Sequence, residues 1–299
     1  GIDGCLDRVN LAACTGDDIC SKGKCVEVAE CTVSDDCNAG EICHKDACTT
    51  ITNDIYYVSP SGSNSNDGSI NTPWQTIDYA FGQTKPGDTV YLREGVYEGK
   101  LVLDCRYGEG GAEGAWFTFS GYPGEDAIIK SKFSLQECKY SHIKNIHFVD
   151  SLLSFYRSPN GGSVYNEYIK LTDNYITGKQ VSYGQVIVTG SNHLIENNTI
   201  YFENGGGGSL DHGIYLAEGE NNIVRGNYVN NASGYGIHLY VRAFSDPHGH
   251  VIRNATIENN IVANSRYGSG FVVASGRAPA SENRTAAVDG VIFRNNIAY

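Results

Sequence analysis

The sequence predicts an all-β fold, a parallel β-helix (solenoid), preceded by a small disulfide-rich domain. A motif of two short apolar strands around an Asn pair recurs five times from residue 165 onward. Gly (36) and Asn (26), the residues that best tolerate tight corners, are abundant among the 299 residues. Eight of the ten cysteines lie in the first 50 residues. We expect disulfide-rich modules over 1–50, a polar linker over 51–54 and the β-helix over 55–299.

The N-terminal cysteines form two similar units. The first unit contains Cys5, Cys14, Cys20 and Cys25, and the second contains Cys31, Cys37, Cys43 and Cys48. The last two gaps are five and then four residues in both units, which indicates a duplicated module of about 20 residues that needs covalent staples to fold. Structural zinc sites usually carry closer Cys pairs, and His44 is the only nearby His, so disulfides are favoured over zinc.

The pairing within each module stays open, because four cysteines allow three connectivities. We favour first to third and second to fourth. The remaining cysteines, Cys105 and Cys138, are 33 residues apart, near one solenoid period, and are expected to bond; two buried free thiols are the alternative.

The repeat predicts the elements of the solenoid in order. Its copies are YIKLTDNYI (168–176), HLIENNTIY (193–201), NIVRGNYVN (222–230), ATIENNIVA (255–263) and VIFRNNIAY (291–299). Between them lie further strands, GQVIV (184–188), HGIYL (212–216), YGIHL (235–239) and SGFVV (269–273). The second position of each Asn pair, marked by Asn174, Asn198, Asn227, Asn260 and Asn296, is spaced by one coil. Because Asn tolerates left-handed backbone, we expect one Asn per coil at the same corner, with the amides stacked in a ladder.

The segment IYYVSPSGSNSNDGS, continued by INTPWQTIDYAF and GQTKPGDTVYLREGVYEG (55–99), resembles the opening of right-handed parallel β-helix proteins of the pectate-lyase superfamily, including family-nine-like lyases. FTFSGYPGEDAIIK (117–130) and YSHIKNIHF (140–148) continue the resemblance. It implies a right-handed solenoid whose first strand covers 55–59 and whose end is capped by a helix over 73–85. We expect Thr72 to cap that helix, with Pro73 at its first position.

The cysteine modules resemble repeats of secreted bacterial and archaeal surface proteins, which implies extracellular spacers. Disulfides also place the protein outside the cytosol, so we expect an extracellular or cell-surface location. The net charge of −12 argues against a nucleic-acid partner. No apolar run is long enough for a membrane span. SNSNDGS (63–69) has the oxygen-rich composition of a calcium loop or of a plain turn; calcium is the one cofactor considered and no metal ligands are assigned.

The catalytic constellation of the resembled enzymes is not recognisable in this chain. In relatives that act on acidic polysaccharides, a Lys or Arg base lies beside a calcium held by several Asp. Here no Lys follows Lys179, and Asp211, Asp246 and Asp289 are far apart in sequence. PHGH (247–250) only imitates the Gly-His-Gly of polygalacturonase-like hydrolases. The sequence therefore leaves open whether the chain is an enzyme.

A polar and aromatic patch is the best candidate site. Aligning HGIYL with YGIHL stacks Tyr215 on His238 at outward positions. The candidate catalytic residues are His212, His238, Arg242, Tyr215 and Asp211, and the candidate glycan-binding residues are Tyr215, His238, Tyr240, Arg242 and His248. An ordinary solvated sheet face is the alternative.

Two functional hypotheses follow from these features. The first is an extracellular structural or adhesive protein that assembles head to tail into a surface filament or array and binds glycans. The second is a secreted polysaccharide lyase or glycoside hydrolase with an atypical site. The chain starts at Gly1 without Met, and its last coil has no cap; we expect a processed or partial chain, or a neighbour that supplies the cap. Asn197, Asn231, Asn254 and Asn283 begin glycosylation sequons.

Overall fold

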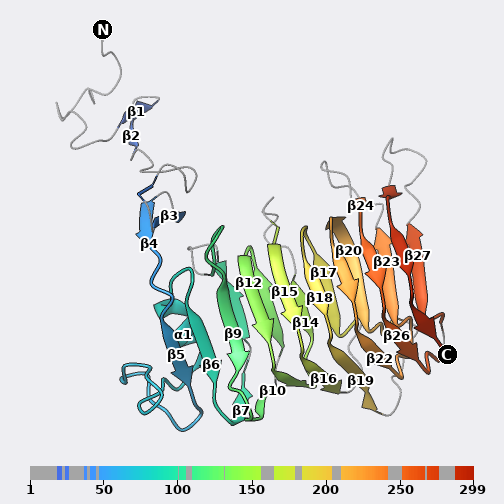
Figure 1. Cartoon of the computed structure of the whole chain (residues 1–299), viewed down its shortest axis with the longest axis horizontal. Helices are drawn as coiled ribbons and strands as arrows, with labels where there is room; N and C mark the ends of the chain where they lie inside the picture. Colours follow the sequence, from blue (N-terminus) through green and yellow to red (C-terminus); the bar gives the residue numbers. More distant parts are fainter. Residues whose placement is uncertain are drawn as a thin grey trace. The chain divides into compact units, whose positions relative to one another are not determined.

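The computed structural model describes residues 19–21, 24–26, 37–38, 41–44, 47–99, 101–105, 110–130, 132–155, 165–178, 184–203, 210–241, 251–266, 268–275 and 287–299. The chain divides into two compact units, 1–51 and 52–299. Figure 1 labels many of the helices and strands of these units.

The first unit contains two antiparallel hairpins, one from each cysteine module. They are β1 (Ile19–Ser21) with β2 (Lys24–Val26), and β3 (Glu41–His44) with β4 (Ala47–Thr50). A disulfide joins Cys37 to Cys48, the second-to-fourth pairing expected for that module, and no described cysteine is free. Cys5, Cys14 and Cys31 lie outside the described residues.

The second unit is a right-handed β-helix of three parallel sheets, as the sequence predicts (Figure 1). The first sheet contains β5 (Ile55–Val58), β6 (Thr89–Leu92), β9 (Phe117–Gly121), β12 (Lys139–Lys144), β15 (Glu167–Thr172), β18 (Leu194–Glu196), β21 (Ile223–Arg225), β25 (Thr256–Glu258) and β29 (Ile292–Arg294). The second contains β7 (Gly95–Glu98), β10 (Ala127–Lys130), β13 (His147–Val149), β16 (Tyr175–Gly178), β19 (Thr199–Phe202), β22 (Tyr228–Asn230), β26 (Ile261–Ala263) and β30 (Ile297–Ala298). The third contains β8 (Leu101–Asp104), β11 (Phe133–Gln136), β14 (Leu153–Phe155), β17 (Val186–Thr189), β20 (Ile214–Glu220), β23 (Ile237–Val241) and β27 (Phe271–Ser275), and β24 (Val251–Arg253) and β28 (Ala287–Asp289) extend the end of β20.

The core runs along the axis of the solenoid, because alternate residues of every strand point inward. On the first sheet, the inward row Ile143, Leu171, Ile195, Val224 and Ile257 is at most 1% exposed. Burying each such side chain contributes about 1.5–3 kcal/mol. The outward row of the same sheet carries alternating charges, Glu196, Arg225, Glu258 and Arg294, which pair from coil to coil.

The Asn ladder lies at the corner between the first and second sheets, and it refines the expectation from the sequence. The Asn174, Asn198, Asn227 and Asn260 side chains are at most 2% exposed, and each Nδ2 donates to Oδ1 of the Asn one coil further on, at 3.0 Å. The residue with left-handed backbone is not this Asn but the one before it, as at Asn197 (φ 54°) and Asn259 (φ 56°). One residue of each pair turns the corner, and the next turns its amide inward.

The capping helix α1 (Ile77–Gln83) starts later than the sequence predicts. The expected N-cap at Thr72 is wrong: the cap is Thr76, whose hydroxyl accepts a bond from Tyr79 N. Trp74 causes the delay, because its backbone N donates to Tyr57 O in a parallel bridge with β5 and its ring is buried. The chain is therefore held extended through residue 74.

Two further features fix the N-terminal coils. A disulfide joins Cys105 to Cys138, the pair expected from the sequence, and both residues are buried. In the loop 63–69, Asp67 Oδ1 accepts bonds from Ser69 N and the Thr72 hydroxyl. Asn64 Oδ1 likewise accepts from Gln75 N and Thr76 N. These side-chain oxygens hold the loop together, which favours the turn over the calcium loop.

Candidate active site on the third sheet

The predicted patch lies on the outward face of the third sheet. Tyr215 on β20 pairs in register with His238 on β23, and their ring centroids are 5.2 Å apart. The neighbouring residues Ile214, Leu216, Ile237 and Leu239 are fully buried in the core. Because side chains alternate along a strand, Tyr215 and His238 project away from the core. The two residues are therefore register partners on one face of the sheet, as the aligned repeats predict, with their rings tilted by 32°.

Tyr235 belongs to this cluster and was missed in the sequence. It occupies the same repeat position as His212, and the two rings stack at 5.2 Å with an interplanar angle of 10°. Tyr235 is also 4.8 Å from His238, and Tyr240 is 5.5 Å from His238 on the other side. The alignment of HGIYL with YGIHL carried the signal, since it exchanges the His and Tyr positions between coils. We call His212, Tyr215, Tyr235, His238 and Tyr240 the His–Tyr cluster.

The sequence predicts that these residues lie on a solvated groove floor. In the structure the cluster is more buried than such a floor. Tyr215 and His238 are each 8% exposed, and His212 is 2% exposed. The physical reason is mutual packing, because His238 has four aromatic neighbours with ring centroids within 5.5 Å. Burial disfavours the charged imidazolium and lowers the pKa of His238 to about 4. Burial, with a smaller contribution from the charge of His238, lowers the pKa of His212 to about 4 as well.

The two histidines differ in their hydrogen bonds. His212 Nδ1 accepts a bond from Tyr235 N at 3.0 Å, so the neutral ring carries its proton on Nε2. Among the described residues, none bonds to His238 Nδ1, although that atom is buried. A buried ring nitrogen without a partner is a feature that native structures usually avoid unless it serves a purpose. His238 is therefore the histidine of the cluster with hydrogen-bonding capacity in reserve.

Asp211 has a bracing position at the edge of the cluster. It is 1% exposed, its carboxylate accepts the Ser233 hydroxyl at 3.1 Å, and its carbonyl accepts Gly234 N. These bonds tie the start of β20 to the segment that leads into β23. Arg242 and His248 lie outside the described residues, so their places in the site rest on the sequence alone.

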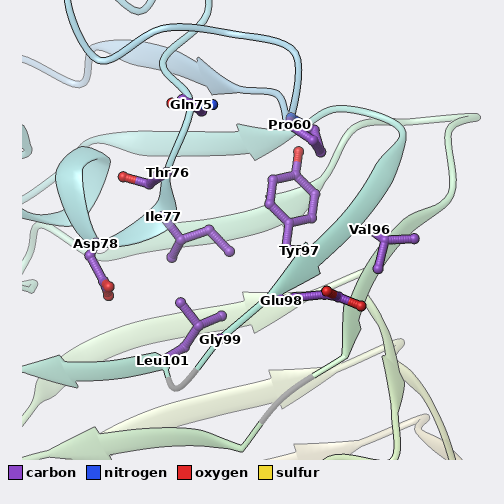
Figure 2. A pocket seen from close by; sticks show the side chains of 10 residues that line it. All are labelled: Pro60, Gln75, Thr76, Ile77, Asp78, Val96, Tyr97, Glu98, Gly99 and Leu101. Atoms are coloured by element: carbon purple, nitrogen blue, oxygen red, sulfur yellow. The ribbon is translucent and has the colours of Figure 1, made fainter.

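Two of the pockets formed by the described residues lie elsewhere on the second unit. One, of about 200 Å³, lies at the capping end between α1 and β7 and is lined by ten residues (Figure 2). Burial raises the pKa of Asp78 in this pocket. Figure 2 shows its carboxylate and that of Glu98 on opposite sides of Ile77 and Leu101, so they do not converge on one point.

The other pocket, of about 180 Å³, is lined in part by three carboxylates. Two of them are engaged in ion pairs, Glu167 with Lys139 at 2.7 Å and Glu220 with Arg253 at 3.0 Å. Within the part of the chain that the structure describes, no three His, Cys, Asp or Glu side chains are grouped to hold a metal ion. The described residues thus do not fit the calcium cluster implied by the resemblance.

The fold and the His–Tyr cluster define a right-handed parallel β-helix with a polar, aromatic face on one sheet. The model of the Pel9A-like right-handed β-helix region matches residues 56–238, and this chain belongs to that family. It is 27% identical over 252 residues to pectate lyase PEL9 of Emericella nidulans, covering 72% of this chain and 57% of that protein. It is 35% identical over 79 residues to the uncharacterized protein YwoF of Bacillus subtilis, covering 26% of this chain and 16% of that protein. The chain therefore spans less than two thirds of each of these relatives.

Several solved structures share the fold, and two of them are compared with this chain. Pectate lyase Pel9A superposes with a TM-score of 0.52 at 15% identity, over 81% of this chain and 78% of that one. An alginate lyase from Paenibacillus sp. str. FPU-7 superposes with a TM-score of 0.51 at 14% identity, over 83% of this chain and 98% of that one. At such identities the likeness shows the fold, and the chemistry has to be argued from the site.

The described sequons coincide with corners of the solenoid. Asn197, Asn231 and Asn254 all have left-handed backbone, which gives each Asn a structural reason to be there. Asn197 and Asn254 are exposed, whereas Asn231 Nδ2 donates to Phe202 O at 2.8 Å. Asn283 lies outside the described residues.

The helix of the described part is far too short to cross a membrane.

Proposed function

We propose that this chain is the β-helix part of a polysaccharide lyase that acts on an acidic glycan, with the His–Tyr cluster as its substrate face. The observation that carries the proposal is a pair of uncharged histidines among three tyrosines on the outward third sheet of a Pel9A-like β-helix. The names of the relatives, pectate lyase and alginate lyase, point to uronate-containing substrates. These relatives support the lyase hypothesis more than the surface-filament hypothesis, which none of the named relatives supports.

The chemistry of such an elimination needs a neutral base. The base removes the proton from the carbon that bears the uronate carboxylate, and the electron pair of that bond forms a carbon–carbon double bond. The glycosidic C–O bond breaks, and the leaving oxygen takes up a proton. With a pKa of about 4, His238 is unprotonated at neutral pH and can accept a proton. An approaching carboxylate would raise that pKa and strengthen His238 as a base.

The other members of the cluster would bind and orient the sugar. Tyr215 lies beside His238 on the adjacent strand, and we assign it the proton return to the leaving oxygen. Tyr240, half-buried, offers a ring for stacking and a hydroxyl for hydrogen bonding. Arg242 follows β23 in sequence and is our candidate for the uronate carboxylate, with His248 as a further glycan contact. His212 and Asp211 would hold the cluster in place.

The proposed setting is extracellular, supported by the disulfides at Cys37–Cys48 and Cys105–Cys138. Polymeric acidic glycans are found outside cells, so the location and the substrate class agree. Glycosylation at the exposed sequons is part of the same proposal.

The test is an elimination assay on purified chain with polygalacturonate and alginate, with and without added calcium. Formation of the unsaturated uronate is followed by its ultraviolet absorbance. We expect activity on at least one polymer, reduced about 100-fold or more in His238→Ala. The matched control is His142→Ala, because His142 lies on the first sheet and its pKa is also lowered to about 4. An inactive chain on both polymers, or equal losses in the two variants, would refute the proposal.

A further inference from the structure

The second sheet presents an outward face whose side chains are uncharged over half the solenoid. From β13 to β30, one outward position per strand is in register: His147, Tyr175, Thr199, Tyr228, Ile261 and Ile297. The adjacent outward row runs through Thr177, Tyr201, Asn230 and Ala263. Neither row contains Asp, Glu, Lys or Arg, in a chain that has 56 such residues and a net charge of −12. The first sheet shows the contrast, since its outward row alternates Glu and Arg.

Four consecutive strands of this face each contribute one aromatic ring. His147 is on β13, Tyr175 on β16, Tyr201 on β19 and Tyr228 on β22, and we call these residues the tyrosine strip. Tyr175 is 45% exposed and Tyr201 is 38% exposed. The His147 and Tyr175 rings are 4.8 Å apart, which matches the spacing of neighbouring strands. The pKa of Tyr228 is raised first by partial burial and then by nearby Tyr299 and Tyr201. The strip thus carries one ring on each of four neighbouring strands, with Tyr201 in the outward row beside that of Tyr175 and Tyr228.

We propose that the tyrosine strip is a second glycan-binding surface, which takes an uncharged β-linked glycan chain along the solenoid axis. Its rings advance by one strand from coil to coil, and the strand spacing of about 4.8 Å is close to the length of one hexose in a β-1,4-linked chain. Sugar rings with equatorial hydroxyls present apolar faces that stack on aromatic rings. The neighbouring Thr199 and Asn230 side chains, both half-buried, supply hydroxyl and amide groups for the sugar hydroxyls.

Charge selects the class of glycan. An acidic polymer would need cations to compensate its carboxylates, and the two outward rows from β13 to β30 contain no Lys or Arg. A neutral glycan loses no ionic hydration on binding there. This surface is on a different sheet from the His–Tyr cluster, so the inference does not rest on the proposed lyase activity. A second copy of the chain is the rival occupant of an exposed strip of this kind.

The test is a depletion isotherm of the purified full chain on phosphoric-acid-swollen cellulose. We expect saturable binding that polygalacturonate does not compete away. Each ring contributes about 3-fold to 10-fold in affinity, so Tyr175→Ala, Tyr201→Ala and Tyr228→Ala combined should weaken binding about 30-fold or more. The corresponding triple Phe variant keeps the rings and should retain most of the affinity. The triple Phe variant also keeps the proposal testable if the triple Ala variant misfolds.

Tyr91→Ala is the matched control, since Tyr91 is a partly exposed strand tyrosine on the first sheet. It should leave cellulose binding unchanged. Three results would overturn the proposal: no binding by the parent chain, equal binding by the triple Ala variant, or displacement by polygalacturonate. The second-copy occupant is tested by sedimentation. A concentration-dependent dimer that the triple Ala variant abolishes, without cellulose binding by the parent, would assign the strip to self-association instead.

Discussion

Asn227→Ala tests whether the Asn ladder holds the coils together. Asn227 is 1% exposed and lies in the middle of the ladder. Its Oδ1 accepts bonds from both the backbone N and Nδ2 of Asn198, each at 3.0 Å. Its Nδ2 donates to Ile195 O at 2.9 Å and to Asn260 Oδ1 at 3.0 Å. Because the left-handed residue of this corner is Gly226, Ala at 227 meets no backbone strain.

The size of the effect follows from the groups left without partners. Truncation orphans the buried backbone N–H of Asn198, which costs about 1–3 kcal/mol. The lost hydrogen bonds from Asn227 Nδ2 to Ile195 O and Asn260 Oδ1 add about 1 kcal/mol each. We therefore expect a loss of about 3–5 kcal/mol in the free energy of unfolding. The small cavity left by the amide lowers the free energy of unfolding further.

The assay is urea unfolding followed by circular dichroism, with the midpoint compared at a fixed slope. The control is Asn230→Ala, which removes an exposed amide whose Oδ1 accepts from Asn264 at 2.9 Å. This control should change stability by about 0.5 kcal/mol or less. If Asn227→Ala is as mild as the control, the buried amides are not what joins the coils.

Three further variants probe stability by the same urea assay. Gln185 is fully buried, and neither of its amide atoms has a hydrogen-bond partner among the described residues, so Gln185→Leu should raise the free energy of unfolding by about 1–3 kcal/mol, and a loss would contradict this. His193 has a pKa lowered to about 4, below its unfolded value of 6.5, so its contribution is intact above pH 6.5 and falls away toward pH 4. His193→Asn, which keeps the backbone N that donates to Asn222 Oδ1, should remove about 3 kcal/mol of that acid loss; an unchanged pH profile would refute it. Replacing Cys105 and Cys138 together by Ala opens a 33-residue loop and should cost about 3–4 kcal/mol, whereas no change would show that the bond is dispensable.

The repeat in the sequence predicted most of the second unit, because one period fixes several elements at once. Each copy such as HLIENNTIY became two strands around a corner, here β18 and β19. The pairing of Tyr215 with His238 followed from the same alignment, since parallel strands in a solenoid stack equivalent residues. The second-to-fourth bond Cys37–Cys48 also agrees with the favoured connectivity.

Two expectations failed where local sequence competes with packing. Thr72 and Pro73 have the composition of a helix start, yet burial of Trp74 against Tyr56, at 4.7 Å between ring centroids, holds the chain extended there. The low exposure of His238 was also invisible in the sequence. A strand pattern predicts which way a side chain points, but some of the rings that close over it come from the neighbouring coil, as those of His212 and Tyr215 do. Tertiary contacts decided both cases.

The two coils that carry Tyr215 and His238 each also contribute one Asn to the ladder. We therefore expect the ladder amides to affect the proposed elimination reaction. Asn198 precedes β19 and β20 in the coil that carries Tyr215, and Asn227 precedes β22 and β23 in the coil that carries His238. The hydrogen bond from Asn198 Nδ2 to Asn227 Oδ1 therefore joins the same two neighbouring coils as the pairing of Tyr215 with His238 on the third sheet. A base needs its position held to within about 0.5 Å to act. Loosening the corner should thus weaken elimination in Asn227→Ala even at temperatures where the chain stays folded, whereas Asn230→Ala should leave it unchanged.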